Sequence, residues 1–206
     1  MRSFTGYLES GFSEKDIYFK RKQNIPSSFL DANCGEVFNQ GSNPWCAAYT
    51  VKTMVESQLR TVNNKVDMSV RDLYCKRSNY DKEGMIPRDC FNILKEKGVT
   101  TNKGLIKILS YQRIGNIEDI KEALIVNGPV FLALPVFIDN EISFWKGNTR
   151  VGGHAISLVA FDDLKNEFTL KNSYGSSWNG NGFVNISYED LNKSLLEAWT
   201  CEVKLM

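Results

Sequence analysis

The sequence has few of the residues on which metal sites, membrane spans and strongly charged interfaces depend. It contains one histidine, five cysteines and no Cys-x-x-Cys pair, so a structural zinc site is not expected. The formal net charge is +1, which gives no electrostatic basis for binding nucleic acid or a membrane surface. No stretch approaches the roughly eighteen apolar residues of a membrane-spanning helix. Nothing in the sequence points to a metal or a cofactor.

The odd number of cysteines and the lack of a Sec-type signal at the N-terminus both indicate a reducing compartment. Residues 1–22 hold no apolar core of the length that a Sec-type signal requires. Free thiols in a reducing compartment are therefore expected. We expect a cytoplasmic protein, or one exported without such a signal, for example as an injected effector. The five cysteines are Cys34, Cys46, Cys75, Cys90 and Cys201.

Hydrophobic residues make up 42% of the 206-residue chain, which suits a folded protein with a substantial core. The first half predicts helices and the second half predicts strands, so the fold class is α+β with two lobes and a cleft between them. We expect an N-terminal arm over residues 1–24, packed on the domain surface, and a domain over residues 25–206. The domain divides into a helical lobe of about 25–103 and a β-rich lobe of about 104–206.

Individual elements follow from hydrophobic spacing and turn residues. Helices are predicted where apolar residues recur at three- and four-residue steps or where a capping residue precedes them. They cover residues 46 to about 60, a short segment that Ser69 caps, 88–97, and a segment that Asn116 caps. Strands are predicted in short apolar runs between turns. They cover residues 105–111, 130–136, 154–161, 167–171 and 182–187.

Cys46 follows a Gly/Asn/Pro turn at the start of the first predicted helix. A thiol near the positive end of a helix dipole is favoured as thiolate, which is the nucleophilic form. Free cysteine is also among the most buried residue types and more often behaves as a small hydrophobe. The position of Cys46 alone therefore leaves both a catalytic and a structural role open.

His154 is the only histidine, and it opens a predicted strand after two glycines. A nucleophilic thiol needs a base, and this chain offers one imidazole for that task. Asn172 directly follows the strand predicted over residues 167–171, 18 residues after His154. An amide oxygen that accepts from an imidazole N–H fixes its tautomer and orientation. Taken alone, the histidine is more often structural, and an Asn-Ser-Tyr-Gly segment is usually a turn.

Three ordered motifs together resemble the papain-like cysteine peptidases. The first is a Gln-Gly pair with Cys46 six residues after Gln40, at the start of a long helix. The second is Gly-His-Ala around His154, at the start of a strand. The third is Lys-Asn-Ser-Tyr-Gly-Ser-Ser-Trp, beginning at Lys171. The resemblance covers roughly residues 25–203 and implies the two-lobed papain-like fold with the active-site cleft between the lobes.

The resemblance implies a role for each matching residue. Cys46 would attack the scissile carbonyl, and His154 would hold the thiolate as an ion pair and later protonate the leaving amine. Asn172 would orient His154. Gln40 and the backbone N–H of Cys46 would form the oxyanion hole, where one preorganised donor contributes about 2.7–4 kcal/mol.

The resemblance also implies a substrate cleft with one main side-chain pocket. The matching cleft residues are Gly84, Met85, Ile86, Val130, Gly153, Ala155 and Trp178. The pocket positions among them are Met85, Ile86, Val130 and Ala155. All four are apolar, so an apolar or aromatic residue is expected two positions before the cut, although core packing is an equal alternative for Val130. Trp178 and Tyr174 would shield the contact between His154 and Asn172 from water.

The sequence departs from the family pattern at several points. Asn43 replaces the usual cysteine three residues before the nucleophile, so the disulfide that this cysteine would form is absent. Ala47 replaces the usual tryptophan after the nucleophile. Cys46 and His154 are 108 residues apart, against about 130–150 in the family, so shorter loops are expected. The usual long inhibitory prosegment is missing, so we expect activity to be controlled in another way or the chain to begin after processing.

The sequence therefore predicts a cysteine endopeptidase that acts on proteins or peptides. Two alternatives stay open: a catalytically silent papain-fold protein that binds peptides, and a papain-fold acyltransferase or isopeptidase. The same triad would serve all of these acyl reactions. We expect a monomer whose partner is its protein or peptide substrate, and an inhibitor or an activating partner also remains open.

Overall fold

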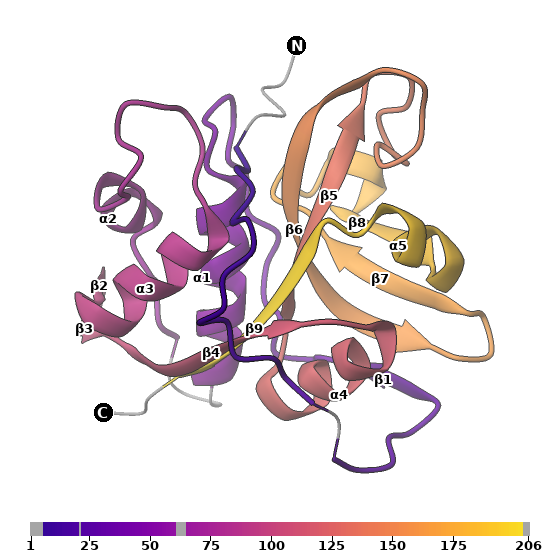
Figure 1. The fold of residues 1–206 in the computed structure, drawn as a ribbon, viewed down its shortest axis with the longest axis horizontal. Coiled ribbons are helices and arrows are strands. Elements are labelled where there is room, and N and C mark those ends of the chain that lie inside the picture. Colours follow the sequence, from indigo (N-terminus) through magenta and orange to yellow (C-terminus); the bar gives the residue numbers. More distant parts are fainter. Residues whose placement is uncertain (1–5, 21, 61–64, 204–206) are drawn as a thin grey trace.

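The computed structural model describes residues 6–20, 22–60 and 65–203. Residues 1–5 and Arg21 of the predicted arm, and residues 61–64 and 204–206 of the predicted domain, lie outside this part. Helices and a mostly antiparallel sheet segregate into two lobes (Figure 1). The predicted α+β fold class is confirmed.

The helical lobe is built around α1 (Cys46–Leu59), which is buried along nearly its whole length. Beside it lie α2 (Val70–Cys75) and α3 (Pro87–Glu96). The predicted capping by Ser69 is confirmed, because its side chain accepts a hydrogen bond from the backbone N–H of Asp72. Pro87 occupies the first turn of α3, where it costs no hydrogen bond. Gly98 follows α3 with a φ of +76°, a conformation that favours glycine.

The β-rich lobe is one seven-stranded sheet in the order β4-β9-β5-β6-β7-β8, with β1 added on β6. Its strands are β1 (Ser28–Leu30), β4 (Ile108–Ile114), β5 (Val130–Phe137), β6 (Arg150–Asp162), β7 (Glu167–Lys171), β8 (Phe183–Ser187) and β9 (Glu197–Val203). A separate hairpin pairs β2 (Val99–Thr101) with β3 (Gly104–Ile106). Outside the sheet lie α4 (Ile117–Asn127), α5 (Tyr188–Ser194) and a 3-10 turn, η1 (Trp178–Gly180). The elements β1, β2, β9 and α5 were not predicted from the sequence.

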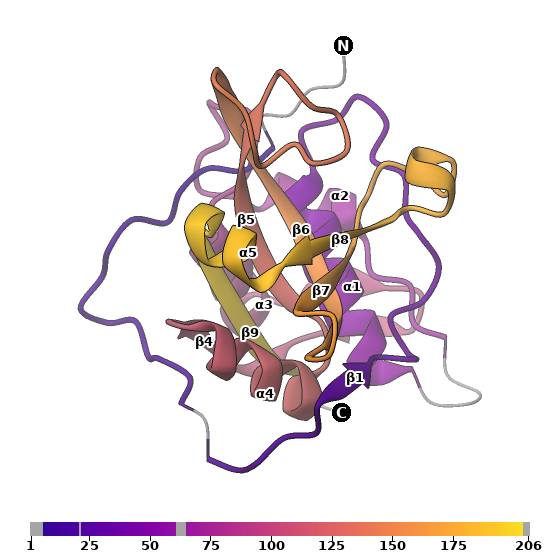
Figure 2. The same ribbon diagram turned by 90° about the vertical axis from the view of Figure 1, so that its right-hand side faces the viewer.

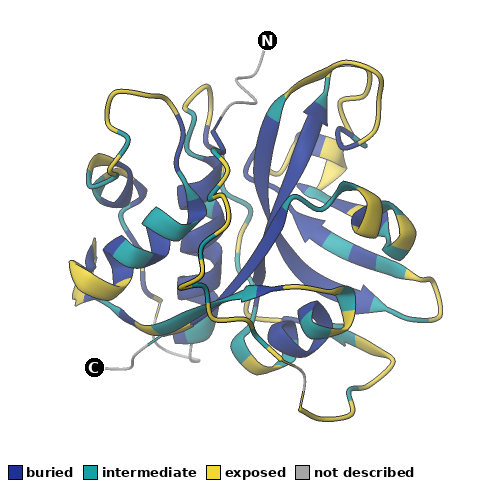
Figure 3. Cartoon of the chain, in the orientation of Figure 1, coloured by how far each residue is buried: buried dark blue, intermediate teal, exposed yellow. Residues whose placement is uncertain are grey.

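Helices cover the sheet on both faces, which gives the molecule two hydrophobic cores. Figure 2 shows α4 and α5 on the face opposite α1. Phe131 and Ala133 of β5 belong to the core shared with α1, whereas Leu132 and Leu134 belong to the core under α4. This alternation is the two-residue period of a strand buried on both faces, and it explains the continuous apolar run of β5 (Figure 3).

The two lobes meet where α1 packs against β6, and the N-terminal arm runs along this junction (Figure 1). Isolated parallel bridges join Tyr7 to Met85 and Tyr18 to Arg113. Tyr7 is buried rather than lying on the domain surface. Within the described ranges, no helix combines the length and the apolar character that crossing a bilayer requires.

Candidate active site

Cys46 is the first residue of α1, and its side chain is fully buried between the lobes. The preceding N-cap residue, Trp45, provides no side-chain cap, so the backbone N–H groups of the first turn point toward the thiol without a competing acceptor from the cap. From the other lobe, the backbone N–H of Ala155 on β6 donates to Cys46 Sγ at 3.5 Å. The thiol is therefore placed directly against the strand that carries His154.

His154 is held in one orientation by Asn172. Its Nε2 lies 2.8 Å from Asn172 Oδ1, which also accepts from the backbone N–H of Ser173. A carboxamide oxygen only accepts, so Nε2 carries the hydrogen and Nδ1 of the neutral ring keeps its lone pair. The hydroxyl of Tyr174 lies 3.3 Å from Nδ1. The imidazole packs edge-on to Phe144 and against Tyr174, with ring centroids 5.3 and 4.8 Å away.

Burial drives both reactive groups toward their neutral forms in this arrangement. It raises the pKa of Cys46 to about 12, although the N–H groups of Ala155, Ala47 and Cys46 itself oppose the shift. It lowers the pKa of His154 to about 4, although the hydrogen bond with Asn172 opposes that shift. No hydrogen bond joins Cys46 to His154 within residues 6–20, 22–60 and 65–203. The pair is thus a thiol and a neutral imidazole here.

Gln40 is buried at the entrance to α1, and both ends of its amide are fixed. Its Nε2 donates to the backbone oxygen of Asn43 at 2.8 Å, and its Oε1 accepts from Ser173 Oγ at 2.6 Å. The backbone N–H of Gln40 also donates to the carbonyl of Ser173. An amide nitrogen has two hydrogens, so Nε2 keeps a second donor in a fixed direction.

The predicted cleft residues of the helical lobe lie together before α3. Gly84 has a φ of +85°, and its N–H donates to the hydroxyl of Tyr74. Met85 is fully buried, but its backbone N–H and C=O are both bonded to the arm. Ile86 is the N-cap of α3 and is only partly buried. Met85 therefore presents the N–H and C=O of an extended backbone edge to a chain segment that lies between the lobes.

The predicted cleft residues of the β-rich lobe are only partly brought together. Gly153 and Ala155 flank His154 on β6. Trp178 packs edge-on to Tyr174, with ring centroids 5.9 Å apart, and so touches the site through Tyr174. The structure does not bring Val130 to the site, because Val130 begins β5 and packs in the core under α4.

Ala133 of β5 lies directly opposite Ala155, which is one of the predicted pocket positions. It pairs with Ala155 on β6 and with Glu197 on β9. The β5 residue at the pocket is therefore Ala133, three positions after the predicted Val130, and the carboxylate of Glu197 lies beside it. The pocket is therefore not lined by apolar side chains alone.

The arm lies over the thiol of Cys46. A Cβ atom on Gly6 would lie 2.6 Å from Cys46 Sγ and 2.9 Å from the backbone oxygen of Pro44, so the chain passes as close as a glycine allows. The N–H of Met85 donates to the carbonyl of Gly6, and the N–H of Leu8 donates to the carbonyl of Met85. The arm therefore occupies the backbone edge that a bound peptide would use.

Two arginines fasten the arm farther along. Asp16 accepts from Arg88 Nε at 2.9 Å and NH2 at 2.7 Å, and from Arg113 NH1 at 3.3 Å. Burial alone would raise the pKa of Asp16, but the hydrogen bonds from Arg88 and Arg113 outweigh it and hold the pKa below the usual value. Arg88 also donates to the carbonyls of Ser10 and Gly11. The arm is thus held at both ends of residues 6–16.

Sequence reasoning missed four residues that shape the site: Gly6, Tyr7, Asp16 and Glu197. Arm residues gave no signal, because the arm has a mixed polar composition and no hydrophobic period. Glu197 opens a segment in which Trp199 and Cys201 recur at two-residue spacing. That spacing was the available signal for β9.

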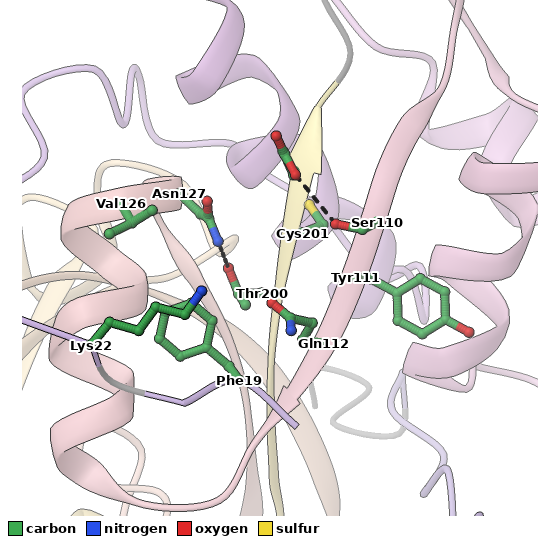
Figure 4. Close-up of a pocket in the computed structure, with 10 residues that line it drawn as sticks. Phe19, Lys22, Ser110, Tyr111, Gln112, Val126, Asn127, Thr200 and Cys201 are labelled. Atoms are coloured by element: carbon green, nitrogen blue, oxygen red, sulfur yellow. Dashed lines mark hydrogen bonds between the residues drawn. The ribbon is translucent and has the colours of Figure 1, made fainter. Parts of the chain in front are cut away.

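Other parts of the described chain have weaker candidates for a functional site. A hollow of about 240 Å³ lies at the β4–β9 edge and is lined by none of the predicted site residues (Figure 4). Across it, Asn127 donates to Thr200 and Ser110 donates to Glu202 (Figure 4). No cluster of three His, Cys, Asp or Glu residues within the described ranges is arranged to hold a metal ion.

Comparison with curated proteins finds relatives of this chain at 24–25% identity. Chymopapain of Carica papaya is 25% identical over 92% of this chain, and falcipain-2a of Plasmodium falciparum is 24% identical over 77% of it. The chain spans 62% of chymopapain and 38% of falcipain-2a. No protein-family model matches the sequence.

Comparison with solved structures gives the same fold. Xylellain, a cysteine protease from Xylella fastidiosa, superposes with a TM-score of 0.83 at 18% identity, over 98% of this chain and 96% of its own. A procathepsin B from Trypanosoma congolense superposes with a TM-score of 0.82 at 15% identity, over 98% of this chain and 87% of its own. The predicted papain-like fold is confirmed.

Proposed function

Because the chain is related in sequence to the papain-like cysteine peptidases and has their fold, we propose that it is a cysteine endopeptidase with Cys46 as nucleophile. The observation that carries the proposal is the convergence of two elements from different lobes. From α1 the Cys46 thiol accepts a hydrogen bond from the N–H of Ala155, which follows His154 on β6, and Asn172 holds the imidazole of His154 in a single tautomer. This is the nucleophile, base and orienting group of a catalytic triad.

The proposed reaction has two stages. His154 Nδ1 takes the thiol proton, Cys46 Sγ bonds to the scissile carbonyl carbon, and His154 returns that proton to the leaving amine as the C–N bond breaks. Water then attacks the resulting thioester while His154 accepts its proton, and the released thiolate takes this proton back as the acid product leaves. Asn172 stays bonded to Nε2 throughout and stabilises the imidazolium.

Gln40 and the start of α1 are proposed to bind the carbonyl oxygen as it becomes negative. The side-chain amide of Gln40 is held by Ser173 and Asn43, so its remaining N–H needs no reorganisation during the reaction. The backbone N–H of Cys46 lies at the positive end of the α1 dipole. Together they would supply two preorganised donors from one side of the cleft.

Activity requires the arm to leave the thiol. With Gly6 in contact with Cys46 Sγ, a substrate carbonyl has no room over the nucleophile. Displacement of the arm would also hydrate the site, and hydration moves both pKa values back toward their ordinary values, which eases transfer of the thiol proton to His154. We therefore propose that the described arrangement is the inactive state of the peptidase.

The two alternative functions keep the same cleft. A silent peptide-binding protein would bind without turnover, and an acyltransferase or isopeptidase would pass the acyl group to an amine or cleave a side-chain amide. No contact among the described residues favours either alternative over hydrolysis.

The test is proteolysis of unfolded casein in reducing buffer, with the arm weakened by Asp16→Asn. Cys46→Ala is expected to lower the cleavage rate by at least about 1000-fold, whereas Cys75→Ala is the matched control because Cys75 is an exposed cysteine. Mass spectrometry of the product termini distinguishes hydrolysis from acyl transfer. Equal casein cleavage by Cys46→Ala would overturn the proposal, and so would intact casein with an alkylatable Cys46.

A further inference from the structure

Two arginine side chains, one from α3 and one from β4, enclose a single carboxylate of the arm. Arg88 Nε donates to Asp16 Oδ1 at 2.9 Å, and Arg88 NH2 donates to Oδ2 at 2.7 Å. Arg113 NH1 adds a third hydrogen bond to Oδ2 at 3.3 Å. Two parallel N–H groups on two oxygens are the planar geometry with which a guanidinium recognises a carboxylate. The side chain of Asp16 is only 3% exposed in this arrangement.

The folded domain positions both arginines without help from the arm. Their guanidinium carbons lie 5.6 and 5.4 Å from the centre of the Trp199 ring, which is within cation–π distance. Trp199 is fully buried in the core shared with α1, so its position does not depend on the arm. The two guanidinium groups are thus a receptor that belongs to the domain, and Asp16 is the ligand that occupies it in the closed state.

Departure of the arm would leave the two guanidinium groups with too little negative charge. Within the described ranges, the one other carboxylate that forms an ion pair with either arginine is Glu197, whose Oε2 lies 4.0 Å from Arg113 NH2. The side chains of Arg88 and Arg113 are 20% and 15% exposed, so water solvates them only in part. A partly buried cation that loses its counter-ion is costly. A carboxylate from another molecule would restore the pairing.

The outer edge of the sheet lies directly beside these guanidinium groups. β4 is the terminal strand at one end of the seven-stranded sheet. The N–H of Arg113 donates to the carbonyl of Ile17, and the N–H of Phe19 donates to the carbonyl of Arg113, both at 2.8 Å. The arm thus adds a short parallel strand to β4 immediately after Asp16, as peptides that extend a sheet edge do. The ligand that suits this site is a peptide with an acidic residue followed by extended backbone.

The same guanidinium groups connect this site to the part of the arm that covers Cys46. Arg88 donates to the carbonyls of Ser10 and Gly11, and Arg113 NH1 donates to the carbonyl of Gly11. A ligand that takes both guanidinium groups would therefore release residues 10–19 of the arm. The contacts near Tyr7 would then hold the arm over the thiol alone. Because such a ligand binds only when this part of the arm has left, it shifts the arm toward the open state.

We propose that Arg88, Arg113 and the outer edge of β4 form a docking site for an acidic peptide segment of a partner protein, and that docking opens the arm. In the closed protein, Asp16 and the short strand after it occupy the site, so the partner competes with the arm. Docking and opening are measured without turnover. The effect of docking on proteolysis rests on the proposed peptidase function.

The first experiment measures docking by fluorescence anisotropy, using the full chain with Asp16→Asn to remove the competing carboxylate. The probe is a fluorescein-labelled peptide that copies residues 13–20, Ser-Glu-Lys-Asp-Ile-Tyr-Phe-Lys, and so carries the aspartate and the strand. A second peptide has asparagine in place of this aspartate. It is expected to bind at least about tenfold more weakly, because the bidentate charge-assisted pair is lost.

Arg88→Lys in the same background keeps the charge but loses the planar fork. It should reduce the difference between the two peptides to about threefold or less. Arg71→Lys, at an exposed position of α2, is the matched control and should keep the full difference. Equal binding of the two peptides, or binding of neither, would overturn the proposal. Displacement of the labelled peptide by inorganic phosphate as readily as by unlabelled peptide would show a general anion site and also overturn it.

The second experiment measures opening, as the rate at which iodoacetamide alkylates Cys46 in the unsubstituted chain. Saturating unlabelled peptide should raise this rate at least about threefold, and the asparagine peptide should not. An unchanged or slower rate with bound peptide would show that docking does not open the arm.

Two further outcomes separate this proposal from others. If the alkylation rate rises with protein concentration in the absence of peptide, the arm of a second copy is the ligand, and the assignment to a different protein is overturned. If the peptide accelerates alkylation but casein stays intact, the peptidase function is overturned and the docking site stands.

Discussion

Two regions meet over the thiol of Cys46, and different forces hold them in place. Cys46 and His154 are fully buried and belong to α1 and β6, whose side chains pack into the two hydrophobic cores. In the arm, Phe12 and Ile17 are 80% and 65% exposed, and Tyr7 is its one fully enclosed ring among the described residues. Apolar burial therefore fixes the site, whereas hydrogen bonds, ion pairs and the single buried ring of Tyr7 hold residues 6–16 of the arm.

The difference implies that the arm can open while the domain stays folded. A hydrogen bond contributes a net of about 0.5–1.5 kcal/mol, whereas truncating a large buried side chain costs about 2–5 kcal/mol. The polar contacts of the arm and the one buried ring of Tyr7 are together a smaller barrier than the two cores, and losing them frees the cleft. Substitutions in the site should therefore lower kcat, whereas substitutions in the arm should raise the alkylation rate of Cys46.

The largest effect is expected within the site, from Gln40→Ala. Loss of one preorganised oxyanion donor lowers kcat about 100- to 1000-fold, and KM and the alkylation rate of Cys46 should stay close to those of the parent. Gln58→Ala is the control, because Gln58 bonds the backbone of Cys201 and Val203 at the far end of α1. Steady-state kinetics in the Asp16→Asn background measure both variants. A similar loss in Gln58→Ala would mean that the effect is structural.

A large effect of opposite sign is expected from Gly6→Val in the arm. The added atoms overlap Cys46 Sγ and the backbone of Pro44, and such overlap costs about 1–3 kcal/mol, which corresponds to about a 5- to 150-fold faster alkylation of Cys46. Thermal unfolding should change little, because the cores are untouched. Glu9→Val introduces the same side chain at an exposed arm position and should leave the alkylation rate unchanged. A slower reaction in Gly6→Val would contradict the placement of the arm.

Asp16→Asn tests the other end of the arm and should have a smaller effect. The amide keeps the shape of the side chain but removes the charge that pairs with Arg88 and Arg113. We expect alkylation of Cys46 to rise about five- to tenfold, since charge-assisted hydrogen bonds are roughly twice as strong as neutral ones. Glu14→Gln, at an exposed neighbouring position of the arm, is the matched control. Equal rates in the two variants would mean that the arginines do not fasten the arm.

Most of the fold was readable from the sequence because its elements carry local signals. The cap at Ser69, the apolar run of β5 and the helix after the turn at Cys46 each depend on residues close in the chain. The strand β9 was not predicted, because it lies between β4 and β5 with residues 197–201 all buried, so the two-residue spacing of Trp199 and Cys201 is not accompanied by an exposed polar face.

The site was readable only in part. Ordered motifs identified Cys46, His154 and Asn172 as candidates, and their roles remain predictions. The arm could not be placed, since its position depends on Arg88, Arg113 and Glu197, which lie far away in sequence and pair with it through single polar contacts. The pocket was displaced from Val130 for a related reason, because the register of β5 against β6 and β9 is a tertiary property.

The smallest expected effect is the pH dependence of the stability of the closed arm, measured against a remote part of the fold. Burial holds the pKa of His154 near 4 while the arm is closed, and hydration would return it toward the ordinary value of about 6.5. Between these values the open state binds a proton that the closed state does not, so stability of the closed arm is present above about pH 6.5 and falls as the pH drops. Asp16 stays charged there because its pKa is held low.

Amide hydrogen exchange at about pH 6.5 and about pH 5 measures this shift directly. The N–H groups of Leu8 and Met85 make the arm's backbone hydrogen bonds. Their protection should fall about three- to fivefold at the lower pH, after correction for intrinsic exchange. This is less than the full linkage effect because the open site is only partly hydrated. The N–H of Leu195, which bonds Leu191 at the end of α5, should keep its protection, since opening there does not expose His154. If all three amides lose protection together, acid loosens the whole domain. The arm then does not open independently of the folded domain, contrary to what its contacts imply.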